Sequence, residues 1–292
     1  MSLLKNKIDF AVIINVKNAN PNGDPLNGNR PRQNYENHGE ISDVCIKRKI
    51  RNRLMEANWP IFVQSDDNKI DGYNSLRERA EKELKCGINK KDACAKWIDV
   101  RAFGQVFAYK NKDKAKGKKT ESEEGNEQSE NSVSIGIRGP VSIHSAYSVT
   151  PVSVSSIQIT KSVSGEGDGT KRASDTMGMK HRIDSGIYVF YGSMNPQLAS
   201  LTGFSDEDAE AIKNALIKLF ENDVSSARPD GSMEIYRVYW WKHNNPNGQY
   251  SSAKVHRSLK VTSKNENPKT IEDYNVILEE LNGLKPEVIE GL

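Results

Sequence analysis

The sequence predicts a mixed α+β protein with a modified ferredoxin-like core, in which the elements follow the order βαββαβ and long insertions separate them. Two observations predict this class. Segments with apolar residues at every second position, typical of strands, alternate in that order with amphipathic helical segments. Long stretches with neither pattern lie between them. With 292 residues, 36% of them hydrophobic, the chain can bury one large core, so we expect a single domain over residues 1–292.

The first strand and the first helix of the core are expected at residues 8–16 and 42–57. Apolar side chains at every second position of the first segment predict a strand with a buried face. Ser42 is a favourable N-cap for the helix, which must end before Pro60. The helical side chains expected to face the core are Val44, Ile46, Ile50, Leu54 and Ala57.

Residues 58–132 are expected to form a helical insertion. It contains a short amphipathic helix at 75–84 and a further one at 90–98. Its last part, 108–132, holds a run of lysines followed by a run of glutamates, with almost no apolar residue. Such a segment buries too little surface to offset the entropy lost on ordering. We therefore expect residues 108–132 to be a disordered Lys/Glu-rich loop.

The rest of the core follows this insertion. The expected helix begins at a capping box, because Ser205 is followed three residues later by Asp208. The other segments are identified by alternation of apolar and polar residues. We expect a long strand or hairpin at 133–146, a strand at 186–192, a helix at 205–222 and a strand at 233–242. Together with the first strand and helix, they complete the order βαββαβ.

The tetrapeptide NPNG occurs twice, at 20–23 and at 245–248. The second copy joins two strand-like runs, and its Pro-Asn-Gly sequence predicts the turn of a β-hairpin. The first copy opens a loop of more than twenty residues that leads to the helix expected at 42–57. Loops of that length are typical of functional sites or disorder. A last helix is expected from the Thr270/Asp273 capping box to a stop at Gly283.

Residues 161–184 have no apolar rhythm and are rich in glycine and in basic side chains. This composition predicts a segment that projects from the core rather than packs in it. We expect a thumb-like projection here.

Positive charge is concentrated on the first helix, although the net charge of the chain is only +3. A dense basic band suits the phosphate backbone of RNA, whereas a charge run alone equally fits a solvated helical face. The preceding loop favours the RNA interpretation, because it adds arginines, amides and glycines that let backbone N–H groups approach an anion. The helical cations are Lys47, Arg48, Lys49, Arg51 and Arg53, and the loop supplies Arg30, Arg32, Asn20, Asn22, Asn27 and Asn29.

Several other classes of protein are not indicated. The three cysteines have no CxxC spacing and the five histidines form no metal-binding motif, so no disulfide framework and no metal site is expected. No apolar stretch is long enough to span a membrane, and no cleavable signal begins the chain. We expect a cytoplasmic protein without a membrane partner.

Two further functions remain open from the residues. His144 and His181, with Lys171 or Lys180, could act as general base and acid in metal-free RNA cleavage, although nothing in the sequence brings them together. The strand aromatics could stack bases on a sheet face, or they could be packing residues. These aromatics are Tyr188, Tyr191, Trp240 and Trp241.

Four blocks of the sequence resemble one protein family. They are NANPNGDPLNGNRPR at 18–32, SDVCIKRKIRNRL at 42–54, WIDVRAFGQVF at 97–107 and GIRGPVSIHSAYSVTPVSV at 136–154. Together they are similar to the backbone subunit of the type I CRISPR surveillance complex (Cascade), in particular its type I-C branch. The resemblance covers most of the chain in order, apart from the Lys/Glu-rich insertion.

This resemblance implies a modified RNA recognition fold that polymerises along a CRISPR RNA and, with other Cascade subunits, presents the guide to target DNA. A thumb-like hairpin of one copy would kink the RNA held by the next. Neither catalysis nor a cofactor is implied. The residues that match the family's RNA-facing loop and helix are Asn20, Asn22, Gly23, Asp24, Arg30, Arg32, Lys47, Arg48, Lys49 and Arg51. Arg138 lies in a glycine-flanked strand block, and Lys171, Arg172, Met177 and His181 lie in the thumb region.

Overall fold

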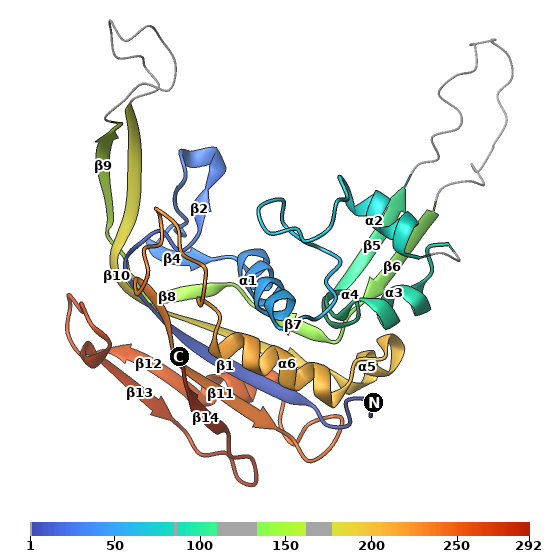
Figure 1. Ribbon diagram of the computed structural model, residues 1–292. Coiled ribbons are helices and arrows are strands. Elements are labelled where there is room, and N and C mark those ends of the chain that lie inside the picture. The colour runs from blue at the N-terminus through green and yellow to red at the C-terminus, as the bar shows by residue number, and fades with distance from the viewer. Residues whose placement is uncertain (1, 85–86, 110–132, 162–176) are drawn as a thin grey trace, which may run out of the picture.

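The computed structural model describes residues 2–84, 87–109, 133–161 and 177–292. A large antiparallel sheet forms its centre, which confirms the predicted mixed α+β class (Figure 1). The strands are β1 (Ile8–Ala19), β2 (Gly23–Asp24), β3 (Arg30–Pro31), β4 (His38–Ile41), β5 (Gly104–Tyr109), β6 (Val133–Arg138), β7 (Val141–Ile143), β8 (Ala146–Pro151), β9 (Val154–Thr160), β10 (Met177–Met194), β11 (Met233–Lys242), β12 (Leu259–Ser263), β13 (Tyr274–Leu278) and β14 (Glu287–Glu290). The α-helices are α1 (Asp43–Glu56), α2 (Leu76–Glu83), α3 (Lys90–Lys96), α4 (Ile98–Phe103), α5 (Pro196–Thr202), α6 (Asp206–Ile217) and α7 (Ser252–Ser258).

The main sheet has the strand order β14-β11-β1-β10-β8-β4, and β7 and β9 also pair with β10. Its paired neighbours are antiparallel. β1 lies at the centre, where Val12 stands opposite Phe190 of β10 on one side and Val238 of β11 on the other. The strands predicted at 8–16, 186–192 and 233–242 are present as β1, β10 and β11 and are neighbours in the sheet.

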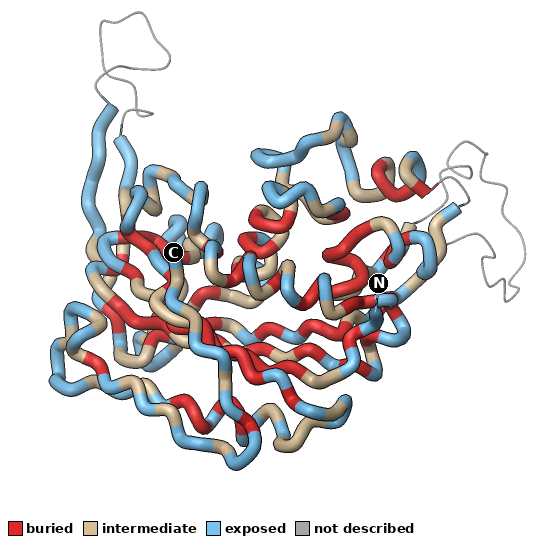
Figure 2. The backbone as a smooth tube through the Cα atoms, turned by 60° about the horizontal axis from the view of Figure 1, so that its bottom comes forward, coloured by how far each residue is buried: buried red, intermediate tan, exposed pale blue. Residues whose placement is uncertain are grey.

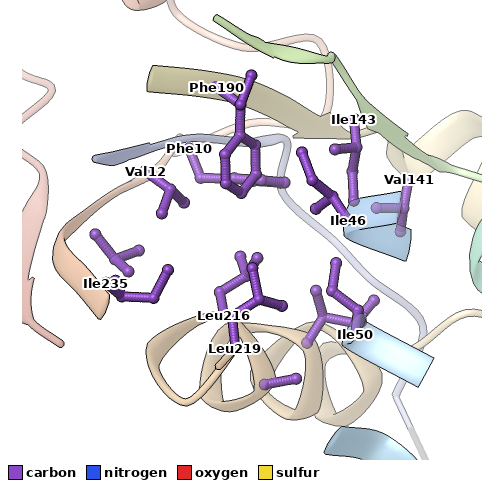
Figure 3. Packing of buried hydrophobic residues seen from close by; sticks show 14 of the residues in the cluster. Phe10, Val12, Ile46, Ile50, Val141, Ile143, Phe190, Leu216, Leu219 and Ile235 are labelled. Atoms are coloured by element: carbon purple, nitrogen blue, oxygen red, sulfur yellow. The ribbon is translucent and has the colours of Figure 1, made fainter. Parts of the chain in front are cut away.

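Side chains of β1 alternate between two buried clusters. Phe10 and Val12 point to the face covered by α1 and α6, where Ile50 and Leu216 meet them (Figure 3). Ile13 points to the opposite face, where α7, β12 and β13 cover the sheet. Both faces of β1 are therefore buried, which accounts for its almost continuous run of apolar residues.

The strand aromatics are packing residues. Tyr188, Trp240 and Trp241 are all buried, and Tyr191 stacks on His256 with ring centroids 4.9 Å apart. Tyr188 and Trp240 belong to the core cluster on the α1 and α6 side, and Trp241 to the cluster under α7, β12 and β13, so none of these three rings is open to bases. The stacking alternative left open by the sequence is not supported by this arrangement.

Helices α2 to α4 and strands β5 and β6 form an insertion lobe (residues 60–84, 87–109 and 133–138) beside the main sheet (Figure 1). The lobe has its own aromatic core, in which the ring of Phe62 lies 4.7 Å from Trp97 and 5.1 Å from Phe107. The predicted helix at 75–84 is present as α2, and the one expected at 90–98 is present as α3, after which α4 follows as a separate helix. Two arginine–carboxylate pairs, Arg51 with Asp99 and Arg101 with Asp208, join the lobe to the core.

The single strand or hairpin expected at 133–146 is wrong, because the segment is divided among β6, β7 and β8. β6 pairs with β5 inside the insertion lobe, while β7 pairs with β10 in the main sheet. The break falls at Gly139 and Pro140. A side chain at Gly139 would lie 2.2 Å from the carbonyl oxygen of Ala102, so the chain can cross α4 only with glycine there.

The final helix expected after Thr270 is also wrong. Its capping box is present but caps only a single 3₁₀ turn, Ile271–Asp273, after which β13 pairs with β12. Tyr274 and the β-branched Val276 and Ile277 pack better on a pleated surface than on a helix, and cross-strand pairing with β12 outweighs the capping signal.

The second NPNG forms the expected turn but not the expected hairpin. The backbone N–H of Gly248 donates to the carbonyl oxygen of Asn245 at 3.3 Å, and Gly248 has a positive φ of 86°. The chain then enters α7, and the following strand β12 pairs with β13 instead of returning along β11.

Smaller differences concern helix faces and ends. Ile46, Ile50 and Leu54 are buried as expected, whereas Val44 is 68% exposed and Ala57 is also exposed. α6 has the predicted Ser205/Asp208 capping box but ends at Ile217, earlier than 222. Apart from the end of β5, the predicted disordered loop at 108–132 lies outside the described residues.

A projecting hairpin extends from the main sheet. It consists of β9 and residues 177–183 of β10, and its strands are mostly exposed (Figure 2). Residues 177–184, expected as part of a projecting loop, are therefore strand. Residues 162–176, which connect these two strands in the sequence, lie outside the described part of the chain.

Candidate nucleic-acid interface

The first NPNG connects β1 to a small hairpin, β2–β3, at the amino-terminal end of α1. Asn22 fixes this connection, because its Oδ1 accepts hydrogen bonds from both the backbone N–H and the hydroxyl of Ser42, each at 2.9 Å. Ser42 in turn caps α1, accepting from the backbone N–H of Cys45 at 3.3 Å. Buried Asn20 donates to the carbonyl oxygen of Asn29 at 2.7 Å. The two amides therefore shape the loop.

The β2–β3 hairpin carries the three charged residues predicted in this loop. Asp24 accepts from Arg32 at 3.2 Å, while Arg30 is exposed and donates to the hydroxyl of Ser156 on β9 at 3.2 Å. A Cβ at Gly23 would lie 2.0 Å from the side-chain oxygen of Asn29, so a larger residue there would displace the Asn29 side chain. The hairpin borders a polar cavity of about 280 Å³.

The basic band of α1 is divided by its surroundings. Arg48 is 54% exposed, whereas the side chain of Lys49 is only 5% exposed. Lys47 is partly buried and pairs with Asp43 at 2.9 Å. Arg51 donates to the buried Asp99 at 2.9 Å and lies over the ring of Phe103. Arg53 is buried and pairs with Glu56, so of the five helical cations predicted from the sequence Arg48 is the most exposed.

Lys49 is a special case because it is buried yet lies at the edge of a cavity. Its ammonium group pairs with Asp223, which follows α6, and it also lies 5.4 Å from the centre of the Phe220 ring. Burial lowers the pKa of Lys49 below its ordinary value, although Asp223 opposes this shift. Burial likewise raises the pKa of the neighbouring Cys45 thiol. The lysine therefore links α1 to the segment after α6.

A groove of about 430 Å³ runs beside α1, and we call it the α1 groove. Its cationic lining consists of Arg48, Lys49 and Arg228, and its carboxylates are Asp67 and Asp223. The rest of the lining is largely amide and backbone. The complete lining is Pro21, Asn22, Gly23, Cys45, Arg48, Lys49, Asn52, Asp67, Asn68, Asn222, Asp223, Val224, Ser225 and Arg228.

Sequence reasoning missed the far wall of the α1 groove. Arg228 lies in the turn before β11 and donates to Asp223 at 2.9 Å, so Asp223 joins Arg228 to Lys49. Asn68 and Asn222 come from two other connections. No local pattern marks these residues, because only the packing of α6 against α1 brings their segments together.

The remaining predicted site residues lie apart from the α1 groove. Met177 is 65% exposed on the projecting hairpin, whereas His181 is nearly buried and contacts the hydroxyl of Ser156 through Nδ1 at 2.8 Å. Arg138 is exposed at the end of β6 in the insertion lobe. Lys171 and Arg172 lie outside the described residues.

The two histidines of the nuclease alternative are not brought together. The backbone N–H of His144 donates to the carbonyl oxygen of Tyr191, near the end of β10. His181 lies near the start of the same strand β10. Residues 181 and 191 are separated by roughly 33 Å along an extended strand. Within the described ranges, no group of three or more His, Cys, Asp or Glu side chains could hold a metal ion. The helices of those same ranges include none with the length and apolar character needed to cross a membrane.

Comparisons with known proteins agree with the resemblance at the level of the Cas7 family. The model of the CRISPR-associated protein Cas7 family matches residues 6–279. A CRISPR-associated protein Cas7 from Haloferax volcanii is 25% identical over 234 residues, which span 76% of this chain and 66% of that protein.

Two solved structures are also similar. One is a CRISPR RNA-guided surveillance complex, of which a chain is 16% identical with a TM-score of 0.42, covering 80% of this chain and 68% of that one. The other is a CRISPR RNA-guided surveillance complex in its pre-nicking state. A chain of it is 15% identical with a TM-score of 0.49, and the match covers 91% of this chain and 83% of that one. Neither TM-score reaches 0.5, so the assignment rests on the family match, which spans most of the sequence. The chain belongs to the CRISPR-associated protein Cas7 family.

Proposed function

We propose that this protein is a CRISPR RNA-binding backbone subunit of a type I CRISPR surveillance complex, of the I-C branch. Successive copies bind along one guide RNA and, with the other subunits, present it for pairing with target DNA. The subunit itself catalyses no reaction and uses no cofactor. The observation that carries the proposal is the α1 groove, which lies between the first NPNG loop and the exposed face of α1. The chain that forms this groove belongs to the Cas7 family.

The charges of the α1 groove suit an RNA backbone. Its three cations exceed its two carboxylates, and Asp223 is shared between Lys49 and Arg228. Arg48 can place its guanidinium fork on a phosphate. The amides of Asn52 and Asn68 offer both donors and acceptors to sugar hydroxyls. Contacts of this kind fix RNA without reading its sequence, as a subunit that holds arbitrary guides requires.

The fold supports a binding mode unlike that of an ordinary RNA recognition module. The strand order β11-β1-β10-β7 with α1 and α6 on one face is, we infer, a ferredoxin-like core within a single domain over 1–292. Ordinary modules stack bases on the open sheet face. Here that face is covered by α7, β12 and β13, so RNA is directed to the helical side.

The projecting hairpin is the candidate for contact between copies. Ile157 and Ile159 are exposed on one of its faces, and Met177 and Met179 on the other. Exposed apolar residues on both faces of a two-stranded arm indicate a partner surface. We infer that this hairpin belongs to a thumb-like projection that includes residues 161–184. We also infer that residues 58–132 form an insertion and that both segments belong to the same domain. We also propose that RNA is contacted by Arg138, Lys171, Arg172 and His181.

Arg48→Ala tests the proposed binding mode. We expect weaker binding to two unrelated single-stranded RNAs by the same factor, and a log–log salt slope reduced by roughly 0.7, because one phosphate contact is lost. Fluorescence anisotropy between about 0.05 and 0.3 M salt measures both. Lys285→Ala is the matched control. Lys285 is exposed and follows Leu284, which belongs to the hydrophobic cluster on the sheet face opposite to α1. A loss confined to one of the two RNAs would rule out backbone recognition.

A further inference from the structure

An ion pair spans the α1 groove. Arg48 of α1 donates to Asp67 at 2.9 Å, and Asp67 belongs to the connection between α1 and α2. The two side chains are 54% and 79% exposed, and both line the groove. The most exposed groove cation is therefore already occupied by a carboxylate of the same chain.

The connection that carries Asp67 is held in place independently of Arg48. Buried Asp99 accepts from the backbone N–H groups of Phe62 and Val63, at 2.8 and 3.0 Å, and from Arg51 at 2.9 Å. Further along, the backbone N–H of Ile70 donates to the side chain of Gln64 at 3.1 Å. Asp67 lies in the chain between these two sets of contacts, neither of which involves Arg48.

A carboxylate and a phosphate place similar demands on a guanidinium group, since each accepts two parallel hydrogen bonds from its fork. A phosphate that reaches Arg48 must displace Asp67 and is also repelled by its charge. An exposed ion pair is weak, so a backbone contacting several groove residues at once can displace it. A single phosphate has fewer compensating contacts.

We propose that Asp67 is an internal competitor for the phosphate bound by Arg48 and thereby makes the α1 groove selective for a run of RNA backbone over small anions. This inference rests on the proposed function. It identifies Asp67 as a specificity-determining residue of the groove, and it also gives Arg51 a positioning role, through Asp99, in place of direct RNA contact.

Asp67→Asn tests the proposal, with Asp66→Asn as its matched control. Asp66 is the adjacent residue, 94% exposed and paired with Lys69 at 3.6 Å, so its replacement removes the same charge without freeing Arg48. We expect Asp67→Asn to bind a single-stranded RNA about threefold more tightly at 0.15 M salt, and Asp66→Asn to bind like the wild type. Inorganic phosphate at a fixed concentration should inhibit RNA binding to Asp67→Asn more than binding to the wild type.

A double-mutant cycle makes the test specific to the ion pair. In the Arg48→Ala background, Asp67→Asn should no longer raise the affinity, because no guanidinium remains to be freed. Equal gains from Asp66→Asn and Asp67→Asn would mean that only net charge matters and would overturn the proposal. An unchanged or weaker affinity of Asp67→Asn would overturn it as well, while leaving RNA binding by the wild type intact. If the wild-type protein binds no RNA, the proposed function fails, and this inference fails with it.

Discussion

Replacing Arg101 with methionine is expected to lower the free energy of unfolding by about 3–5 kcal/mol. Arg101 of α4 donates to both carboxylate oxygens of Asp208 on α6, at 2.9 and 2.6 Å, and both side chains are largely buried. Asp208 also closes the capping box of α6 by accepting from the backbone N–H of Ser205. Removing the arginine leaves a buried carboxylate without its cation at the junction of the insertion lobe and the core. Urea denaturation measures the effect.

Lys260→Met is the matched control for this prediction. Lys260 pairs with Glu279 across β12 and β13, where both side chains are more than half exposed, and such pairs contribute about 0–1 kcal/mol. If Arg101→Met destabilised the protein no more than Lys260→Met, the buried pair would not be what holds the insertion lobe to the core.

The second large effect is expected on RNA affinity. The triple variant Arg30→Gln, Arg48→Gln, Arg228→Gln should bind single-stranded RNA roughly 50-fold more weakly at 0.15 M salt, because each lost phosphate contact with a single strand costs about fourfold there. Lys49 and Asp223 are left in place, so their buried pair still supports the fold. Anisotropy titrations give the affinity, and the melting temperature checks the fold.

The control is a second triple variant with the same change in net charge, Lys254→Gln, Lys260→Gln, Lys285→Gln. These lysines are exposed on the segments that cover the other face of the sheet. Charges farther from the RNA than the Debye length of about 8 Å are screened, so the affinity should stay within about twofold of the wild type. A comparable loss in both triple variants would show attraction by net charge instead of binding in the α1 groove.

The order of the central elements could be predicted from the sequence because each carries a local signal. Alternation in β1, β10 and β11, the Ser42 N-cap of α1 and the capping box of α6 are properties of neighbouring residues. The same kind of signal failed at Thr270, where a genuine capping box precedes a strand. There the pairing of β13 with β12, which joins residues far apart in the chain, outweighs the local preference.

The candidate site could be predicted only in part. The first NPNG loop and Arg48 were identified from composition and lie at the α1 groove. The pattern of α1 could not show that Lys49 and Arg51 turn inward, because their partners Asp223 and Asp99 come from other elements. Arg228 was missed for the same reason. Charge density along a helix indicates a possible interface, whereas tertiary packing decides which cations reach solvent.

RNA is expected on the face of the molecule that carries the α1 groove, not on the face covered by α7, β12 and β13. Photo-crosslinking of a single-stranded RNA containing 4-thiouridine, followed by mass spectrometry of the attached peptides, tests this directly. We predict crosslinks in 20–32, 45–52 and 222–228, the segments around the α1 groove. On the other face, His144, Tyr147, Tyr191 and Val261 line a cavity of about 450 Å³. Crosslinks confined to that cavity, with none around the α1 groove, would contradict the account.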